Sequence, residues 1–209
     1  KQIKDGKKEL HIVNDKLGTP TYTHDFAENT KLLIEKRERG HFNMVCQGLT
    51  SRLEVAVELI SLLDLKNHIS IITGGSTGIG QATVETFAKE GATVIFCDVN
   101  DKQGKINEKN LRKKGYNVYF KKWDVSKEND VKKLINFTIN NFKRIDILFN
   151  NAGIEQPVTP SHNVDLKTFE KIISINLKGV FICCKYTLPY MIKQKKGSIV
   201  NNSSISAFA

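Results

Sequence analysis

Several residue types and patterns are scarce in this sequence, and each scarcity excludes a class of protein. The 209 residues include four cysteines, and none stands in a Cys-x-x-Cys pair or at a metal-ligand spacing. We therefore expect free thiols, a reducing compartment such as the cytoplasm, and no metal site. No apolar run approaches the ~18 residues of a membrane-spanning helix, and residues 1–10 lack the apolar core of a secretory signal, so we expect no membrane partner.

Acidic residues are also few relative to basic ones. The chain has 22 Asp and Glu against 32 Lys and Arg, for a net charge of +10, and nearly all of the excess lies in residues 68–209. The basic residues are scattered singly and in pairs, whereas a nucleic-acid face gathers them together with stacking aromatics. We interpret the charge as a solvated surface and expect no nucleic-acid partner.

From His68 onward, short apolar segments alternate with amphipathic ones. Alternation at this spacing predicts right-handed crossovers and a parallel sheet. The expected fold class is therefore α/β, a Rossmann-type doubly wound sheet. We expect strands at 68–73, 92–97, 117–120, 145–149 and 198–202. We expect helices from the glycine-rich turn to 90, then over 102–114, 127–142 and 166–193, the last with Leu188–Pro189 as a candidate break.

Residues 1–67 have a different character and form the first of two expected domains. A turn at 18–21 precedes a predicted helix that runs through Glu38 and ends at Gly40, and a short strand is expected at 41–46. Ser51 and Glu54 form a capping box before an apolar helix. This pattern predicts a small, mainly helical N-terminal segment.

The strongest functional motif is the segment Thr73–Gly80, TGGSTGIG, between a predicted strand and a predicted helix. Its glycines allow a tight turn, close approach of backbone to phosphate, and close helix–sheet packing. The helix N-terminus would direct free N–H groups at a pyrophosphate. A flexible turn is the ordinary alternative, but the strand–turn–helix context favours a dinucleotide site. The candidate contacts are Gly74, Ser76, Thr77, Gly78, Ile79 and Gly80.

Asp98 follows the second predicted strand, 18 residues after Gly80. A carboxylate at this place can accept hydrogen bonds from the adenosine ribose hydroxyls. It would repel a 2′-phosphate, and the glycine-rich loop contains no Arg or Lys, so the expected cofactor is NAD. The alternative is an ordinary turn aspartate, because residues 98–101 are also good helix-capping material.

These motifs, together with Asp124-Val125, NNAG at 150–153, Asn176 and Ser203–Ser204, resemble the classical short-chain dehydrogenase/reductase family over residues 68–209. The resemblance implies that Asp124 binds the adenine amino group and that the Val125 N–H faces the ring. It implies cofactor contacts from Asn151, Ala152 and Gly153, a proton relay through Asn176, and carbonyl polarisation by Ser204. The apolar neighbours of Asn176 favour its burial. The implied substrate is a secondary alcohol or a carbonyl compound, and the full-length family member is expected to be a homo-oligomer.

One part of the family pattern is absent from the 209 residues. The family's acid–base pair is Tyr-x-x-x-Lys, and none of the five tyrosines here has Lys four positions later. We therefore expect this chain, as given, to be catalytically inactive, with a sheet that is incomplete at its C-terminal edge. A non-catalytic NAD-binding remnant is the alternative function.

Residues 1–67 resemble another protein, the C-terminal part of dTDP-4-dehydrorhamnose reductase. The residues that carry this resemblance are Asn14-Asp15, GTPTYT at 18–23 and Asp25-Phe26-Ala27. The tail of one reductase thus precedes the beginning of another. A fusion, a degraded gene or a sequence-assembly junction near Leu65–His68 would each give this order. A nucleotide-sugar reductase is accordingly a further functional alternative.

Overall fold

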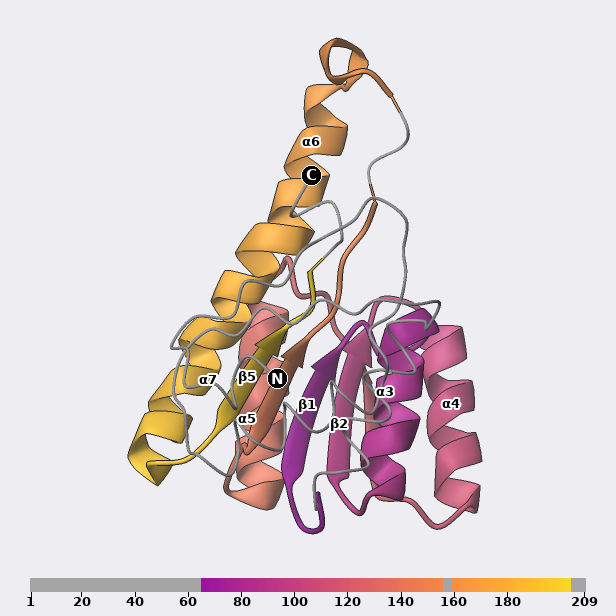
Figure 1. Cartoon of the computed structure of the whole chain (residues 1–209), viewed down its shortest axis with the longest axis vertical. Helices are drawn as coiled ribbons and strands as arrows, with labels where there is room; N and C mark the ends of the chain where they lie inside the picture. The colour runs from indigo at the N-terminus through magenta and orange to yellow at the C-terminus, as the bar shows by residue number, and fades with distance from the viewer. Residues whose placement is uncertain (1–64, 156–158, 204–209) are drawn as a thin grey trace, which may run out of the picture. The chain divides into compact units, whose positions relative to one another are not determined.

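The computed structural model describes residues 65–155 and 159–203, which form a parallel sheet with helices packed on it (Figure 1). Its five strands stand in the order β3-β2-β1-β4-β5, and all neighbours are parallel. The expected doubly wound α/β fold is confirmed. The strands are β1 Ile69–Thr73, β2 Thr93–Asp98, β3 Val118–Lys122, β4 Ile147–Asn150 and β5 Ser198–Asn201. The helices are α3 Gly78–Lys89, α4 Asp101–Lys113, α5 Glu128–Phe142, α6 Leu166–Ile172 and α7 Val180–Gln194.

A 3-10 turn covers Ser161–Asn163, and a π-helical segment, Ile173–Gly179, joins α6 to α7. Among the described residues, no helix combines the length and the apolar character needed to cross a membrane. The elements expected in residues 1–64 lie outside the described residues, as does Ser204.

The core lies on both faces of the sheet because the central strands are buried on each side, as parallel strands usually are. On one face, Ile71 and Ile95 pack with Leu134 of α5 and Ile182 of α7. On the other face the contacts are aromatic. The rings of Phe87 and Phe149 lie 6.5 Å apart, and those of Phe96 and Phe120 lie 5.2 Å apart.

The last helix differs from the expectation at Pro189. The helix continues through Pro189, so the candidate break at Leu188–Pro189 is wrong. Proline removes one intrahelical hydrogen bond, but the buried side chains Ile182, Thr187 and Met191 keep α7 packed. The departure from α geometry comes earlier, at Ile173–Gly179, where the hydrogen bonds span five residues. No sequence pattern predicted these wider helical turns.

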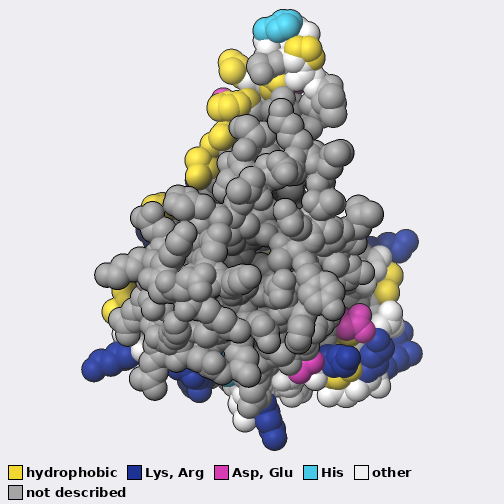
Figure 2. All heavy atoms as spheres, in the orientation of Figure 1, with side chains coloured by type: hydrophobic (Ala, Val, Ile, Leu, Met, Phe, Trp, Pro, Cys, Tyr) yellow, Lys and Arg dark blue, Asp and Glu magenta, His cyan; other side chains and the backbone are white. Residues whose placement is uncertain are grey.

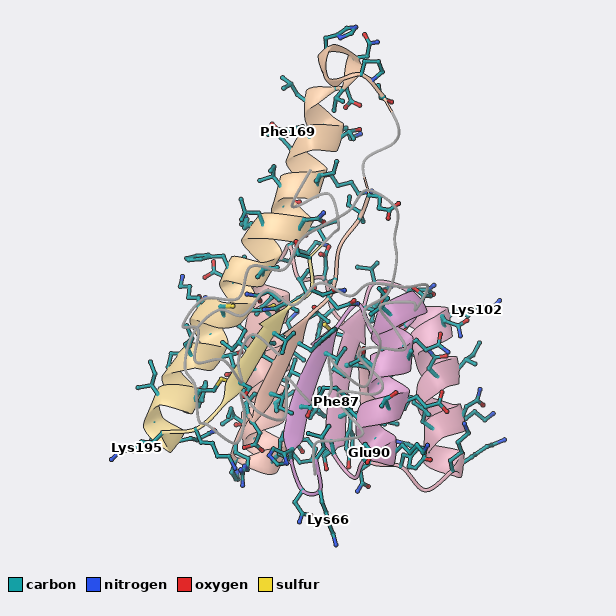
Figure 3. The ribbon with its side chains drawn as sticks, viewed as in Figure 1. Lys66, Phe87, Glu90, Lys102, Phe169 and Lys195 are labelled. Atoms are coloured by element: carbon teal, nitrogen blue, oxygen red, sulfur yellow. The ribbon has the colours of Figure 1, made fainter. Side chains whose placement is uncertain are left out.

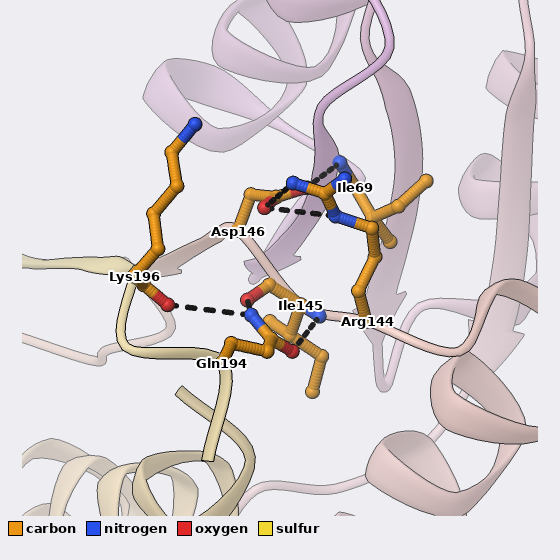
Figure 4. Close-up of polar contacts among 6 residues, drawn as sticks. All are labelled: Ile69, Arg144, Ile145, Asp146, Gln194 and Lys196. Atoms are coloured by element: carbon orange, nitrogen blue, oxygen red, sulfur yellow. Dashed lines mark hydrogen bonds and ion pairs between the residues drawn. The ribbon is translucent and has the colours of Figure 1, made fainter. Parts of the chain in front are cut away.

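Strand β4 begins two residues later than expected, and the hydrogen bonds of Ile145 explain why. Gln194 accepts from the Ile145 N–H at 3.1 Å and donates to the Ile145 carbonyl at 2.9 Å, so a side chain replaces the ladder (Figure 4). The next residue, Asp146, is 2 % exposed and accepts from the Ile69 N–H at 2.9 Å and from Arg144. These contacts tie the start of β4 to β1 and to the end of α7.

The other strand and helix limits differ from the expected ones by one or two residues. Strand β2 extends one residue further, so Asp98 is its last residue and does not follow it. Strand β3 extends to Lys122, because it pairs with β2 as far as Asp98.

Candidate functional site

The glycine-rich loop after β1 and the segment after β4 are tied together by Thr73. The Thr73 hydroxyl accepts from the N–H groups of Asn151 and Ala152, both at 3.0 Å. The Asn151 amide in turn donates to the carbonyls of Thr73 and Gly74, both at 3.2 Å. Strands β1 and β4 are neighbours at the point where the strand order reverses. In sheets of this kind, ligands bind in the crevice beyond the carboxyl ends of the strands at that point.

Two of the predicted loop glycines are required by close packing. A Cβ on Gly80 would lie 2.0 Å from the Gly74 carbonyl oxygen, and one on Gly74 would lie 2.8 Å from the Cα of Ala152. Gly74 also has a φ of +66°, which side-chain-bearing residues rarely adopt. The loop, the first turn of α3 and the segment after β4 therefore approach one another closely.

Gly78 differs from these two glycines because its Cβ direction is open. Its φ is +53°, and a Cβ there would have no heavy atom within 4 Å. Thr77, the N-cap of α3, is exposed and makes no side-chain capping bond, and the first turn of the helix holds no acidic residue. Ile79 is half-buried. The loop thus leaves room beside the positive end of a helix, which is the environment that a phosphate group favours.

Asp98 lies against the glycine-rich loop at the end of β2. Its Oδ2 accepts from the Ser76 N–H at 3.0 Å, and its Oδ1 accepts from the Asn100 N–H at 2.9 Å. The side chain is half-buried. Since each carboxylate oxygen can accept a second hydrogen bond, Asp98 remains able to receive two hydroxyl groups. Ser76, also predicted as a cofactor contact, is itself fully buried, and its hydroxyl donates to the Asn100 carbonyl at 3.5 Å.

Asp124 and Val125 lie in the turn after β3. Asp124 is half-buried, and its Oδ1 accepts from the N–H and the hydroxyl of Ser126, at 3.0 and 2.7 Å. Val125 is 7 % exposed, and a Cβ on Gly179 would lie 2.9 Å from its side chain. This turn is therefore held between α5 and the π-helical segment, at the same end of the sheet as the glycine-rich loop.

Asn176 is exposed, so the burial favoured by its apolar neighbours is wrong. Those neighbours are not a buried shell: Ile173 is 38 % exposed and Leu177 is 62 % exposed. The Asn176 side chain donates to the Ile154 carbonyl at 2.8 Å and accepts from the Ile154 N–H at 2.9 Å. This reciprocal pair joins the π-helical segment to the chain just beyond Gly153, which is exposed.

A row of four amide side chains links the ends of β4 and β5, and of these the sequence predicted a role for Asn151 alone. Asn150 donates to the Asn201 side chain at 2.8 Å, and Asn202 donates to the Asn151 side chain at 2.9 Å. Asn150 also contacts the Cys184 sulfur at 3.5 Å. Burial raises the pKa of the Cys184 thiol, which keeps it neutral beside this row. The doublets Asn150-Asn151 and Asn201-Asn202 were the available sign.

The predicted site residues within the described part of the chain gather at one end of the sheet. Figure 3 marks this end by Lys102, at the start of α4, whereas Lys66, Glu90 and Lys195 lie at the opposite end. The arrangement offers backbone N–H groups at a helix N-terminus, a carboxylate at Asp98 and amides near Asn176. Such a set suits an elongated ligand with phosphates at its centre and hydroxyl groups at its end.

Two family models match the chain. The model described as short chain dehydrogenase matches residues 68–209, and the one described as RmlD substrate binding domain matches residues 2–72. Both agree with the resemblances drawn from the sequence. The two matches meet at β1, so the junction between the two kinds of sequence lies at the first strand of the sheet.

Curated relatives and solved structures cover the same region. An uncharacterized oxidoreductase, YxbG, of Bacillus subtilis is 43% identical over 145 residues, which are 69% of this chain and 53% of the relative. (+)-Borneol dehydrogenase 2 of Salvia officinalis is 39% identical over 146 residues, 69% of this chain and 51% of the relative. The chain thus spans about half the length of these relatives.

Among solved structures, the crystal structure of gox2181 matches with a TM-score of 0.67 and 30% identity, over 70% of this chain and 58% of the other. A metagenomic short-chain oxidoreductase in complex with NADP matches with a TM-score of 0.66 and 26% identity, over 68% of this chain and 65% of the other.

Proposed function

Because the chain belongs to the short-chain dehydrogenase family, we propose that residues 68–209 bind NAD(H) for an oxidoreductase that acts on a secondary alcohol or carbonyl. When bound, the nicotinamide supplies the hydride chemistry. The protein's own contribution is to bind the nucleotide, orient it and place polar groups beside the reacting carbon. The observation that carries the proposal is the glycine-rich loop in the crevice between β1 and β4.

The fit of a dinucleotide is supported by Gly78. Its open Cβ direction and positive φ leave space where a side chain would otherwise stand. A pyrophosphate in that space would receive N–H groups from the first turn of α3 and from the loop itself. In this proposal Thr77 and Ile79 line the phosphate position, Asn151, Ala152 and Gly153 line the nicotinamide side, and Asp124 and Val125 meet the adenine.

The preference for NAD over NADP rests on Asp98. Its carboxylate stands at the end of β2 and is held by the Ser76 and Asn100 N–H groups. A 2′-phosphate brought to this position would meet a like charge. Lys102 is the nearest competing influence in the sequence, but it is exposed at the start of α4, where water screens its charge.

The catalytic part of the proposal follows the family resemblance. Asn176 would take part in a proton relay near Ile154, and Ser204 would polarise the substrate carbonyl. No tyrosine in the 209 residues is followed four positions later by lysine. We therefore propose that a polypeptide of these residues alone binds nucleotide without measurable turnover, because positioned proton transfer contributes roughly a hundred- to ten-thousand-fold.

The partners of the protein form the last part of the proposal. Besides the small-molecule substrate, we propose a homo-oligomer for the full-length protein and a place in the cytoplasm. Support for the oligomer comes from exposed apolar side chains along α6–α7, among them Phe169, Leu177 and Phe181. Residues 1–67 are proposed to form a separate domain that takes no part in nucleotide binding.

The cofactor proposal is tested by titrating NADH and NADPH into the 209-residue protein and following nucleotide fluorescence. We expect NADH to bind at least about fivefold more tightly, since one like-charge contact is worth about 1 kcal/mol even in water and more near a protein surface. Asp98→Ala should narrow that gap. Asp101→Ala is the matched control, because it removes one carboxylate from the first turn of α4, close to Asp98 in the sequence.

Two outcomes would contradict the proposal. Equal affinities for NADH and NADPH in the unaltered protein would show that Asp98 does not discriminate between the two ribose groups. A preference for NADPH that disappears in Lys102→Ala would show that Lys102 dominates the adenosine end of the site.

A further inference from the structure

Asn107 is a buried polar residue on α4 that the nucleotide site, as described so far, does not use. It is 5 % exposed and lies on the face of α4 turned toward the glycine-rich loop. Its Nδ2 donates to the Ser76 carbonyl at 2.8 Å, across 31 residues of sequence. A buried amide is expected to have partners, and here one partner is the backbone of the loop itself.

The orientation of the Asn107 amide is fixed by a second residue, Gln103. Gln103 Nε2 donates to the Asn107 Oδ1 at 2.8 Å, one helical turn earlier. Since a donor occupies the oxygen side, the nitrogen side must face Ser76. The Gln103 N–H is in turn bound by the Asn100 side chain, at 3.2 Å, which caps α4.

Ser76 connects Asn107 to Asp98 through its backbone. The Ser76 carbonyl is held by Asn107, while the Ser76 N–H donates to the Asp98 Oδ2 at 3.0 Å. Ser76 is fully buried, so neither bond can be replaced readily by water. The two peptide groups that flank Ser76 are thereby fixed, one by α4 and one by Asp98.

We propose that Asn107 is a positioning residue for nucleotide specificity, acting on Asp98 through Ser76. Asn107 fixes the Ser76 peptide, and the Ser76 N–H fixes the Asp98 Oδ2. The Oδ1, which accepts from the Asn100 N–H, keeps a second acceptor position that this orientation directs at the ribose. The inference rests on the proposed function, because it names a second residue behind the same discrimination. Loss of the Asn107 donor frees the Ser76 carbonyl and lets Asp98 rotate away from its productive orientation.

The experiment measures two quantities on the full 209-residue chain. The first is the ratio of the NADPH and NADH dissociation constants, and the second is hydrogen–deuterium exchange of the peptide that contains Ser76, without nucleotide. In Asn107→Leu, which keeps the branched shape but removes the donor, the ratio should fall about fivefold, the worth of one hydrogen bond. Exchange at Ser76 should become faster. Gln103→Met, at a partly exposed position, should give a smaller change in the same direction.

A double variant separates positioning from a general structural role. In an Asp98→Ala background, Asn107→Leu should leave the ratio unchanged, because the two residues act in one chain of contacts and their effects do not add. Asn110→Leu, at an exposed position of the same helix, is the matched control and should change neither quantity.

The other possible results contradict either the positioning role of Asn107 or the proposed function. If Asn107→Leu weakens both nucleotides equally, or if neither the ratio nor the exchange changes, Asn107 does not position Asp98. Should Asn107→Leu fail to fold, Gln103→Met decides by the same two readouts. If the unaltered protein binds neither nucleotide, the proposed function fails, and unchanged Ser76 exchange in Asn107→Leu then overturns the positioning role separately.

Discussion

Gly80 is the residue at which the glycine-rich loop has the least room. An added Cβ would lie 2.0 Å from the Gly74 carbonyl oxygen and 2.6 Å from the Asn151 amide nitrogen. Gly80→Ala should therefore push the loop away from α3 and lower the free energy of unfolding by about 1–3 kcal/mol, as overpacking does. Urea denaturation followed by circular dichroism measures this change.

Gly153→Ala is the matched substitution for this prediction. The nearest atom to its Cβ, Asn176 Oδ1, would lie at 3.5 Å, an ordinary contact. Its stability should stay close to that of the unaltered protein. A Gly80→Ala protein as stable as Gly153→Ala would show that the loop and α3 can separate without cost.

The sequence predicted individual residues where their position relative to a nearby strand or helix was sufficient to select them. The glycines of TGGSTGIG and the carboxylate of Asp98 stand at fixed distances from a strand end, so spacing alone was enough to select them. Thr73 and Asn107 could not be found in this way. Their partners lie 78 and 31 residues away, and only the folded sheet brings those groups within hydrogen-bonding distance.

The beginning of α6 shows how a single side chain stabilises an element. Asp165 is the N-cap; it accepts from the Thr168 N–H at 2.9 Å and from the Thr168 hydroxyl at 2.7 Å. These bonds, the hydroxyl first, lower the pKa of the Asp165 carboxyl. A lowered pKa means that the carboxylate stabilises the folded helix above its unfolded pKa of about 3.9, and that this effect is lost as pH falls through the folded value.

Asp165→Ala should accordingly speed amide exchange in α6 at pH 7 and have a smaller effect at an acidic pH below the folded pKa of that carboxyl. The reason is that a protonated Asp165 is a poorer cap than the carboxylate. Exchange of the peptide over residues 165–172, compared between variants at each pH, measures the difference. Asp165→Asn keeps a capping oxygen and serves as the control. An equal effect of Asp165→Ala at both pH values would contradict a charged cap.

The elements were predicted more accurately in number than in extent. Short apolar runs identified every strand of the described residues from His68 onward, and the central strands carry such runs because they are buried on both faces. Amphipathic periodicity identified the long helices, because each buries one face. The first and last residues of each element depend on side-chain contacts that the apolar pattern does not reveal. Ile145 is apolar and fully buried, yet the Gln194 side chain takes its hydrogen bonds, and β4 starts after it.

At the scale of the whole molecule, α6, the π-helical segment and α7 carry a row of exposed apolar side chains, here called the apolar stripe. Figure 2 shows hydrophobic side chains along one edge of the upper part of the molecule. Phe169, labelled in Figure 3, is one of them. The stripe consists of Leu166, Phe169, Ile173, Leu177, Phe181, Leu188 and Ile192, between 38 % and 76 % exposed. A row of exposed apolar side chains of this kind is typical of a contact surface.

Charging the stripe should reduce self-association. Phe181 is 64 % exposed and Leu177 is 62 % exposed, so a double substitution to Glu should leave the core intact. Sedimentation velocity over a range of concentrations should show a shift toward monomer. Lys178→Ala combined with Lys193→Ala, at exposed positions of the π-helical segment and α7, lowers the net charge by the same amount and is the control. A variant that associates as strongly as the unaltered protein would remove the stripe from the interface.

The global arrangement followed from the sequence because strand–helix alternation leaves few topologies open. A doubly wound sheet places the ends of β1, β2 and β4 at one edge, and the predicted residues at those ends are indeed gathered there. The apolar stripe was not predicted. Its residues share the helical spacing of buried ones, and only the fold shows which face is left uncovered.

The π-helical segment has a geometrical consequence for the stripe. Its members from Phe169 to Phe181 follow one another at intervals of four residues. In an α-helix of 3.6 residues per turn, side chains at this interval rotate around the helix axis by roughly 40° at each step. Wider turns at Ile173–Gly179 take up that advance and hold the row in phase. Deleting one residue there would restore α pitch with little net rotation, because six residues at about 100° each turn nearly as far as the present seven in wider turns. Leu166 and Phe169 would keep nearly the same direction relative to Ile192, and the row would lose its four-residue spacing at one step.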